Sequence, residues 1–481
     1  MTSRAGRIAA ILVIAALPRI WAAVWDQGIF WPDEIFQSTE PAHHFAFGYG
    51  YVAWEFQDGA RSWLFPGAIG LLWKLLVALG VTAAPTLVVS AKLGMAALAL
   101  AGIYASMRIA EKLAGPEAGV ICGLLSAAFP PSIVYGSRCM SEMASGPLIA
   151  IVVLLTLDRD RRKLILAGCL AGLTIFLRFQ NGLIVVALLG WLLAQRRGHH
   201  AGLYAVGAAV TGLAGGVLDL LTWGSMFHSF VTNVRFNLIE GRSAEYGVAP
   251  AWYYMEVFWS AIGVSAVAVV AGFAAVARRA TGLLLIVLLY VAAHTAVPHK
   301  EFRFLMPIVP LMLALSGAGL AVLIGRVWNM PKAGAPLHVR PVAWVVAGVL
   351  AATMGWRAAY ATFDDFGQRE EPLSGPQSVW HAFEEVNRLL WVAGERADLC
   401  ALAMVEHGPV WSGGYTYFHR DVPIIWMIGV DPAPANYVLA HVDIPLPADY
   451  ATVETIGQAR LARRPGGCSA PPPAYTRLFP K

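Results

Sequence analysis

The segment His299-Lys300-Glu301-Phe302-Arg303-Phe304 separates two apolar stretches of this chain, 283–297 and 305–324. Such stretches predict membrane helices, because about 20 apolar residues cross the roughly 30 Å hydrocarbon core of a bilayer. Ionisable side chains at the junction of two such helices are costly unless they meet partners at an interface or in a cavity. The segment therefore predicts a short turn between two membrane helices, with a cationic cluster that suits a phosphate group.

The composition of the whole chain agrees with this interpretation. Of 481 residues, 58% are hydrophobic and only 14% are charged, whereas a soluble chain averages about 25% charged. We therefore expect an integral membrane protein with many spans. The formal charge of +5 is small for this length. It fits cytosolic loops attracted to anionic membrane lipid and argues against nucleic acid as a partner.

The apolar stretches predict an all-α polytopic membrane protein with about 11 to 13 transmembrane helices. The predicted spans are 5–25, 86–107, 115–135, 140–157, 163–178, 181–195, 201–222, 256–277, 281–297, 304–325 and 341–360. A further apolar stretch, 64–80, is short and carries Lys74. If it crossed the membrane fully, the parity of the chain would break, so we expect a re-entrant or interfacial helix there.

Basic turns between the spans predict which side each loop faces. Arg196-Arg197 and Arg278-Arg279 are typical of cytosolic turns. Counting outwards from them places loop 224–255 and the cationic cluster on the external side. Arg4 and Arg7 indicate a cytosolic amino terminus, which places loop 26–63 on the external side as well. The residues after 360 lie on that side too.

The chain divides by composition into a membrane domain, 1–360, and an extramembrane domain, 361–481. The second part has about 120 residues, enough for its own core. We expect a small α/β domain in this part, with a helix over 376–394 and strands over 399–405 and 436–442. Cys400 and Cys468 lie in this part. Whether they form a disulfide depends on an oxidising compartment, and the sequence leaves both states open.

The first external loop contains the acids that suit catalysis. Pro32 followed by Asp33 and Glu34 is typical of the first turn of a helix, where acids meet the positive end of the dipole. On a regular helix, Asp33, Gln37, Glu40 and His44 would share one face. That face has two interpretations: the wet side of an interfacial helix, or a site where Asp33 or Glu34 removes a proton from a hydroxyl.

Two other segments also have two interpretations each. Trp54 and the neighbouring tyrosines suit stacking on a sugar ring, or an aromatic belt at the membrane interface. A helix begun at Pro298 would place His299 and Arg303 on one face, with Lys300 beside it. Arg303 offers a bidentate fork for a lipid-linked phosphate, or these side chains anchor the helix with Glu301 as their counter-ion.

Taken together, these motifs resemble the GPI and N-glycan α-mannosyltransferases, which are multispan enzymes of the GT-C class. The first loop resembles their first lumenal loop in Pro32-Asp33-Glu34, Gln37, Glu40-Pro41, His43, Gly48, Gly50, Trp54-Glu55, Arg61-Ser62 and Pro66. The cluster at 299–304 matches their H-K-E-x-R-F signature. Their middle loop is similar to Asp219, Trp223-Gly224, Asn233, Phe236-Asn237, Tyr246-Gly247, Pro250 and Trp252-Tyr253. Arg138 with Met140-Ser141 resembles their R-T-M-S turn, although Cys139 replaces the threonine.

The resemblance implies an inverting transfer of a sugar, mannose in that family, from a polyprenyl- or dolichyl-phosphate donor to a hydroxyl of a glycan or glycolipid. Asp33 would be the base and Glu34 would assist it. The donor phosphate would be held by His299, Lys300, Arg303 and Arg138. The substrates would contact Gln37, Glu40, His43, Trp54, Glu55, Arg61, Asn237, Tyr246 and Trp252. Side chains would stabilise the leaving charge, so we expect no metal and no other cofactor.

The compartment is inferred from composition. Abundant Ala, Gly and Arg with very short cytosolic loops favour a bacterial inner membrane, with the active site facing the periplasm, over an ER membrane. Two other functions stay open from the sequence. A transporter or flippase of lipid-linked sugars would use the same phosphate cluster without a base. A scaffold would use the tail to bind protein and need neither.

Overall fold

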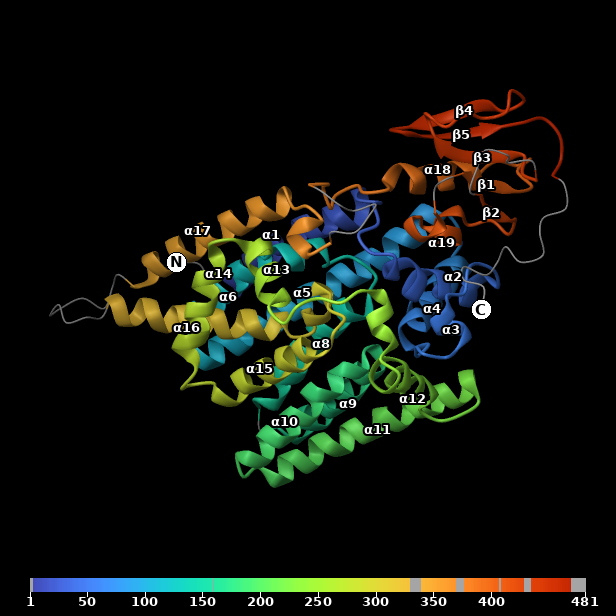
Figure 1. Cartoon of the computed structure of the whole chain (residues 1–481). Helices are drawn as coiled ribbons and strands as arrows, with labels where there is room; N and C mark the ends of the chain where they lie inside the picture. Colours follow the sequence, from blue (N-terminus) through green and yellow to red (C-terminus); the bar gives the residue numbers. More distant parts are fainter. Residues whose placement is uncertain are drawn as a thin grey trace. The chain divides into compact units, whose positions relative to one another are not determined.

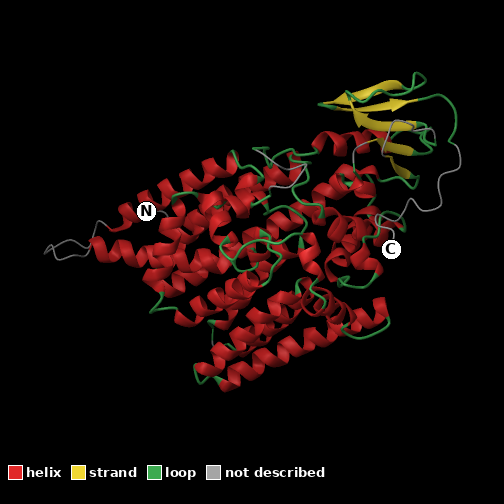
Figure 2. Ribbon diagram, viewed as in Figure 1, coloured by secondary structure: helices red, strands yellow, loops and turns green. Residues whose placement is uncertain are grey.

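The computed structural model describes residues 3–158, 160–328, 339–368, 376–405, 408–427 and 434–468. The chain forms two compact units, and each draws on two separate segments. Unit 1 comprises Met1–Trp21 and Gly94–Ser378, and unit 2 comprises Ala22–Leu93 and Val379–Lys481. Helices dominate, and the strands of the described residues all follow residue 400 (Figures 1 and 2).

The named elements of unit 1 are all helices, among the residues that the structure describes. It begins with most of α1 (Arg4–Trp25) and resumes within α5 (Ala84–Ala114). Its other α-helices are α6 (Pro116–Ala128), α7 (Pro130–Val134), α8 (Ser141–Thr156), α9 (Arg161–Leu177), α10 (Gly182–Ala194), α11 (Gly198–Trp223), α12 (His228–Val234), α13 (Tyr253–Ile262), α14 (Ser265–Val276), α15 (Thr281–Ala296), α16 (Val309–Trp328) and α17 (Val339–Ala359). Short 3₁₀ or π turns join them: η2 (Phe179–Asn181), η3 (Arg235–Ile239), η4 (Arg242–Tyr246), η5 (Phe302–Leu305) and η6 (Asp364–Phe366).

Five described helices are long and apolar enough to cross a membrane: Arg4–Trp25, Ala84–Ala114, Gly198–Trp223, Val309–Arg326 and Pro341–Ala359. The pair α13 and α14, bent by 118°, raises the number to six if the two form one span. Five shorter apolar helices, of 10–17 residues, accompany them, including 64–78 and 281–296. These helices confirm a polytopic membrane protein. The total of 11 to 13 spans stays a prediction, because several predicted spans form helices shorter than 18 residues.

Small residues let the helices of unit 1 approach closely. A Cβ atom on Gly168 of α9 would lie 2.0 Å from the carbonyl oxygen of Tyr204 in α11. A Cβ atom on Gly319 of α16 would lie 1.8 Å from the carbonyl oxygen of Gly272 in α14. Helices in membranes associate largely through such close packing, because lipid provides no hydrophobic force between them. The glycines of the apolar stretches therefore set the contacts that hold this bundle together.

Unit 2 combines the first predicted external loop with the C-terminal part of the chain. From the loop come η1 (Ile35–Thr39), α2 (Glu40–Phe47), α3 (Trp54–Gln57) and α4 (Leu64–Ala78). From the C-terminal part come α18 (Glu384–Gly394), η7 (Pro409–Trp411), α19 (Gly414–Phe418) and five strands. One apolar core holds both segments, with Ile35, Phe36 and Tyr51 from the loop packed among Leu389, Leu402 and Leu439. Loop 26–63 therefore folds with the C-terminal part as one body.

The strands form a single mixed sheet in the order β2-β1-β3-β5-β4. Strand β1 (Leu402–Val405) is parallel to β2 (Ile424–Met427) and β3 (Tyr437–His441). Strand β5 (Ala459–Arg463) is antiparallel to β3 and to β4 (Ala451–Ile456). The predicted α/β domain is thus confirmed. The two predicted strands correspond to β1 and β3, whereas β4 was not predicted from the sequence, because most of its side chains are exposed.

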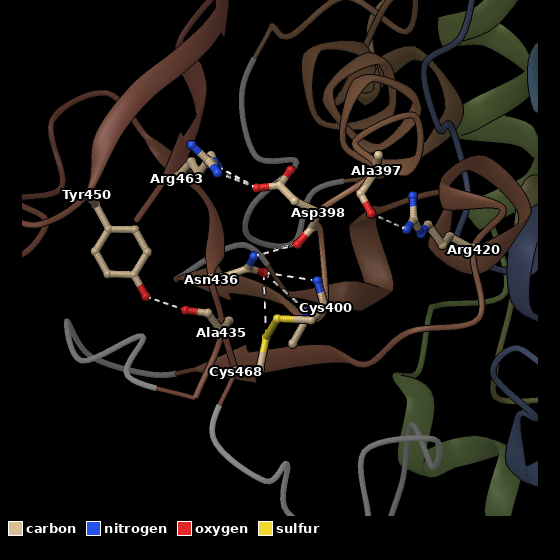
Figure 3. Close-up of a disulfide and its surroundings, with 10 residues drawn as sticks. Ala397, Asp398, Cys400, Arg420, Ala435, Asn436, Tyr450, Arg463 and Cys468 are labelled. Atoms are coloured by element: carbon tan, nitrogen blue, oxygen red, sulfur yellow. Dashed lines mark hydrogen bonds and ion pairs between the residues drawn. A yellow bond between two sulfur atoms is a disulfide. The ribbon is translucent and has the colours of Figure 1, made fainter. Parts of the chain in front are cut away.

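Two local features of unit 2 refine the sequence predictions. The helix predicted over 376–394 begins only at Glu384, because His381 and Phe383 adopt left-handed backbone conformations with φ near 60°. The disulfide that the sequence left open is present: Cys400 and Cys468 are bonded, with 6.0 Å between their Cα atoms (Figure 3). Asn436 fixes the backbone at one end of the disulfide, because its Oδ1 accepts a hydrogen bond of 3.1 Å from the backbone N–H of Cys400.

Candidate functional site

An alternating chain of charges forms the first set of site residues, in unit 1. Glu142 at the start of α8 places Oε1 3.0 Å from Arg178 Nη1 and 3.3 Å from Arg303 Nη1. Arg303 also pairs through Nε with Glu301, whose other oxygen lies 2.8 Å from Nε2 of His299. These side chains are between 1% and 13% exposed. The arrangement is a buried ion network, which needs this mutual pairing to be stable.

The backbone around the cluster differs from the predicted helix begun at Pro298. Helix α15 ends at Ala296, Glu301 is extended at φ −134° and ψ 143°, and a 3₁₀ turn follows over Phe302–Leu305. The predicted shared helix face of His299 and Arg303 is therefore wrong. The carboxylate of Glu301 brings the two side chains together instead, in the counter-ion role that one interpretation gave it.

Part of the middle loop lies against this cluster. Nδ1 of His299 lies 2.9 Å from the carbonyl oxygen of Gly247, and Lys300 donates from Nζ to the carbonyl of Ala249 at 2.7 Å. The Tyr246 ring lies 6.4 Å from the His299 ring, measured between centroids, and is 56% exposed. This loop therefore fixes the two residues by backbone contacts and leaves an exposed aromatic ring beside them.

The other predicted residues of unit 1 have different surroundings. Asn237 donates to the backbone and side-chain oxygens of Asn233 within the same turn. Trp252 is 62% exposed at the start of α13. Arg138 is buried, and its Nε donates to the carbonyl oxygen of Val134 at 3.2 Å. No described contact joins Asn237 or Trp252 to the charge network.

The site residues predicted from the sequence did not include Glu142 or Arg178, two members of the network. Both lie at ends of apolar helices, and each is the lone charge within several neighbouring residues of its helix. Isolated charges next to apolar helices are a recognisable signal, because they require partners. The sequence does not indicate which side chains pair with Glu142 and Arg178.

Electrostatics favour the charged forms of His299 and Glu301 in the turn between α15 and α16. Burial lowers the pKa of His299, but its hydrogen bond to Glu301 and the charge of that carboxylate outweigh burial, so the pKa lies above its ordinary value. Burial raises the pKa of Glu301, yet Arg303 and His299 overcome it and hold that pKa below its usual range. Counting permanent charges, the network and the neighbouring Lys300 hold three cations, Arg178, Lys300 and Arg303, and two carboxylates, Glu142 and Glu301. The region therefore carries excess positive charge, as a phosphate site requires.

The second set of site residues lies in unit 2, on the helix that follows Pro32. The helix begins at Asp33, as predicted, and passes directly into the π turn Ile35–Thr39. Asp33 is partly exposed, whereas Glu34 is buried and its Oε1 accepts a hydrogen bond of 2.8 Å from the backbone N–H of Phe30. Of the two acids, Asp33 is the one with access to solvent. Single π turns occur often at functional sites.

Gln37, Glu55 and Arg61 gather near Asp33. Nε2 of Gln37 donates to Oε1 of Glu55 at 2.8 Å. Burial raises the pKa of Glu55, Arg61 lowers it, and the charge of Asp33 raises it further. Trp54 begins the short helix α3 just before Glu55 and is partly exposed. The predicted residues Gln37, Glu55 and Arg61 are thus brought together around the first-loop acid.

Glu40 has other partners, and the predicted common face with Asp33 and Gln37 does not include it. Its side chain is fully buried and accepts hydrogen bonds from the backbone N–H of Tyr51 at 2.9 Å and from the Thr416 hydroxyl at 2.8 Å. The π turn is wider than an α turn and changes the angular position of every residue after it. Glu40 therefore joins the first loop to α19 of the C-terminal part.

His43 makes a similar connection one turn later. Its Nδ1 lies 3.1 Å from the carbonyl oxygen of Tyr49, and its Nε2 lies 2.9 Å from Nδ1 of His419. Burial, followed by the nearby His419, lowers the pKa of His43 to about 3. His43 is therefore neutral, with Nδ1–H donating to Tyr49 and Nε2 accepting from His419. Both Glu40 and His43 hold the two segments of unit 2 together.

One group of the described residues has the side chains of a metal site. Ligand atoms of Asp26, His381 and Glu384 lie within 4.8 Å of one another. Asp26 already accepts hydrogen bonds from the backbone N–H groups of Gly28 and His381, both at 3.0 Å. Glu384 pairs with His381 and Arg388. Hydrogen bonds and ion pairs thus account for this group, and we assign no metal to it.

Comparison with known proteins places both sets of residues within one family. The model of the Alg9-like mannosyltransferase family matches residues 10–371. The chain belongs to this family. The resemblance seen in the sequence motifs is thereby confirmed.

The curated relatives of this chain are named as GPI mannosyltransferases. GPI mannosyltransferase 3 of Yarrowia lipolytica is 27% identical over 316 residues, which cover 63% of this chain and 60% of that protein. The human GPI alpha-1,2-mannosyltransferase 3 is 23% identical over 337 residues, covering 67% of this chain and 59% of that protein. The chain therefore spans about three fifths of the length of these relatives.

Solved structures confirm the GT-C fold. ArnT from Cupriavidus metallidurans, bound to undecaprenyl phosphate, superposes with a TM-score of 0.63 at 14% identity, over 96% of this chain and 99% of that chain. The Archaeoglobus fulgidus oligosaccharyltransferase gives a TM-score of 0.55 at 12% identity, over 90% of this chain and 68% of that chain. At such low identity the likeness concerns the fold alone.

Proposed function

We propose that this chain is an inverting mannosyltransferase. It takes mannose from a polyprenyl-phosphate donor and transfers it to a hydroxyl of a glycan or glycolipid acceptor. The observation that carries the proposal is the family match over 10–371, which includes both sets of site residues. The names of the curated relatives support mannose as the sugar and a glycolipid as the acceptor class.

Asp33 acts as the base in this proposal. Its carboxylate removes the proton of the acceptor hydroxyl while the hydroxyl oxygen forms a bond to the anomeric carbon. The bond between that carbon and the donor phosphate oxygen breaks, and the phosphate leaves with the electron pair. Partial exposure supports Asp33 in this role over Glu34, whose buried carboxylate is held by the Phe30 N–H and orients the turn.

The donor phosphate is held by the excess positive charge around the 299–303 turn. His299, Lys300 and Arg303 contribute it, together with Arg138, and side chains of this kind stabilise the charge of a leaving phosphate. Arg303 is only 4% exposed and already pairs with two carboxylates. Its role in the proposal is therefore to keep the turn charged and rigid. His299 contributes its positive charge, because Gly247 and Glu301 already accept from its two ring nitrogens, and Lys300 offers its remaining N–H to the phosphate.

Catalysis takes place on the external face, which we assign to the periplasmic side of a bacterial inner membrane. The disulfide between Cys400 and Cys468 supports an external position, because disulfides persist in oxidising compartments. Asp33 belongs to the same compact unit as this disulfide. The same compartment is therefore proposed for the base and for the C-terminal domain.

Replacing Asp33 by Asn in the purified full-length protein tests the assignment. Transfer of labelled mannose from polyprenyl-phosphate mannose in vesicles should fall by about 10²–10⁴, the usual contribution of a general base. Asp58→Asn in the same loop, at an exposed position, is the matched control and should keep full activity. Unchanged transfer by Asp33→Asn would remove Asp33 from the mechanism.

A second measurement identifies the substrates. Mass analysis of surface glycans from a strain lacking this chain should reveal a truncated glycan lacking one mannose and an accumulated acceptor. Intact glycans together with failure to move the lipid-linked sugar across the membrane would contradict transfer and favour a flippase.

A further inference from the structure

Loop 224–255 begins by folding back along the membrane helix that precedes it. Ser229 of α12 donates to Oδ2 of Asp219 from its backbone N–H at 2.9 Å and from its hydroxyl at 2.5 Å. Asp219 is fully buried and lies in α11, four residues before that helix ends at Trp223. At 1.5 Å per residue, α12 therefore reaches a level about 6 Å below the end of α11.

Aromatic contacts hold α12 against two membrane helices. A Cβ atom on Gly216 of α11 would lie only 2.7 Å from Cζ of Phe227, so glycine leaves the space for that ring. The Phe227 ring also lies 6.5 Å from the Phe176 ring of α9, and Phe230 lies 5.4 Å from Phe179, measured between centroids. Helix α12 thus packs against the C-terminal ends of α9 and α11 (Figure 1).

The outward surfaces at this level are apolar. Helix α11 is long and apolar enough to cross a membrane, and its exposed side chains Leu213, Val217, Leu220 and Leu221 form one helical stripe that continues to its last turn.

Along the continuous helix of α12 and η3, Val231, Leu238 and Ile239 are 60%, 67% and 76% exposed. Large apolar side chains gathered at such exposure are typical of an interaction surface or a membrane contact. Arg235 is exposed beside them and pairs with Glu240 at 2.6 Å. An arginine can lay its stem along apolar surface while its guanidinium reaches the lipid headgroups.

We propose that residues 228–239 lie in the external leaflet of the membrane, with Val231, Leu238 and Ile239 in contact with lipid acyl chains. The segment is then an interfacial helix, with its apolar side about 5–10 Å below the headgroups. The charged residues that follow it, Arg242 and Glu245 among them, lie at headgroup level. Acyl chains are the occupant because this apolar surface continues the exposed stripe of a membrane-spanning helix at the same level.

This placement also sets the depth of the phosphate-binding turn, a step that rests on the proposed function. The same loop contacts the turn through its backbone: Gly247 accepts from His299, Ala249 accepts from Lys300, and the Ala249 N–H donates to the carbonyl oxygen of Pro298 at 3.0 Å. A loop anchored in the leaflet holds the turn near the headgroups, where the phosphate of a membrane-anchored donor lies.

Spin labels in the full-length protein test the depth, in phosphatidylcholine vesicles without donor. Among the described free cysteines only Cys169 is not fully buried, and Cys169→Ser removes it from all variants. Labels are attached through Ile239→Cys, through Leu221→Cys as the hydrocarbon standard, and through Glu245→Cys as the aqueous standard. Oxygen concentrates in hydrocarbon, whereas a nickel chelate stays in water, so we expect the label at 239 to match the label at 221.

Two results would overturn the proposal. Nickel access at 239 equal to that at 245 would place the segment in water. Protection at 239 from both reagents would mean that protein covers the patch, for instance a second copy of this chain. Because the measurement needs neither donor nor turnover, failure of mannose transfer would leave it unaffected.

Kinetics test the link to the donor site. Leu238→Ser combined with Ile239→Ser should raise the KM for polyprenyl-phosphate mannose several-fold and leave kcat unchanged, because the reacting groups stay in place. Val206→Ser combined with Val210→Ser, at exposed positions in the middle of α11, is the matched control and should keep the original KM. An unchanged KM in the loop variant would refute the role of the loop in positioning the turn.

Discussion

Glu142 is the residue on which the buried charge network of unit 1 depends. It lies 3.0 Å from Arg178 Nη1 and 3.3 Å from Arg303 Nη1, and its side chain is 1% exposed. With an effective dielectric constant near 20, each pair is worth about 5 kcal/mol before desolvation is counted. Removing one partner of a buried pair typically destabilises by about 3–5 kcal/mol, because a charge is left uncompensated. We expect Glu142→Gln to lower the free energy of unfolding by this amount.

The network also predicts that a second substitution restores part of the loss. Arg303 keeps Glu301 as a partner after Glu142 is replaced, and Arg178 loses its 3.0 Å contact with Glu142. Adding Arg178→Met to Glu142→Gln balances the charges again. The double variant should therefore be more stable than Glu142→Gln alone by roughly 2 kcal/mol, within the range of coupling between contacting residues.

Denaturant unfolding of the detergent-purified protein measures all three variants, with Arg178→Met alone completing the cycle. A loss below about 1 kcal/mol for Glu142→Gln would mean that the pairs contribute little more than exposed ones. A double variant less stable than Glu142→Gln would show that Arg178 stabilises through packing and not through its charge. Either result would refute the alternating-charge interpretation.

Three further predictions concern unit 2 and the 299–303 turn. Because 68 positions separate Cys400 from Cys468, replacing both by serine should destabilise unit 2 by about 4 kcal/mol, measured by denaturant unfolding; a loss near zero contradicts the loop-entropy argument. Burial raises the pKa of Glu40 to about 7, above an unfolded value near 4.3. The folded state thus binds the proton more tightly, and stability should fall by about 3 kcal/mol as pH rises from ~4.5 to ~7. Glu40→Gln should flatten that slope in pH-dependent melting, and an unchanged slope assigns it to another group. His299→Gln should abolish the protonation that the raised pKa favours and raise the KM for the lipid donor about tenfold or more, with an unchanged KM as the contrary result.

The turn at 299–303 illustrates how far the sequence leads. Its charges and flanking apolar stretches identify it as a site, and Glu301 was recognised as a counter-ion candidate. The helix expected from Pro298 is absent, because the chain stays extended through Glu301. The helix prediction was wrong here because helix propensity is a weak local preference. Tertiary contacts, such as the ion pairs of Arg303, override it.

The first loop shows the same limit. Pro32 and the two acids correctly predict where the helix begins, because capping chemistry is local. The π turn at Ile35–Thr39 then moves Glu40 away from the expected face. No residue pattern within this segment predicts the π turn. Its consequence appears only in the partners of Glu40, which lie as far as 376 positions away at Thr416.

By itself the sequence determined the membrane class, the family and the identity of the candidate base and phosphate-binding turn. These follow from hydropathy and from motif spacing, which are properties of short segments. Tertiary structure alone decided which partners the buried charges have: Glu142 pairs with Arg178 and Arg303, Glu40 accepts from Thr416, and Arg19 donates to backbone carbonyl oxygens. The physical reason is that a buried charge takes its energy from whichever groups the fold brings within about 3 Å, and chain separation carries no information about that distance.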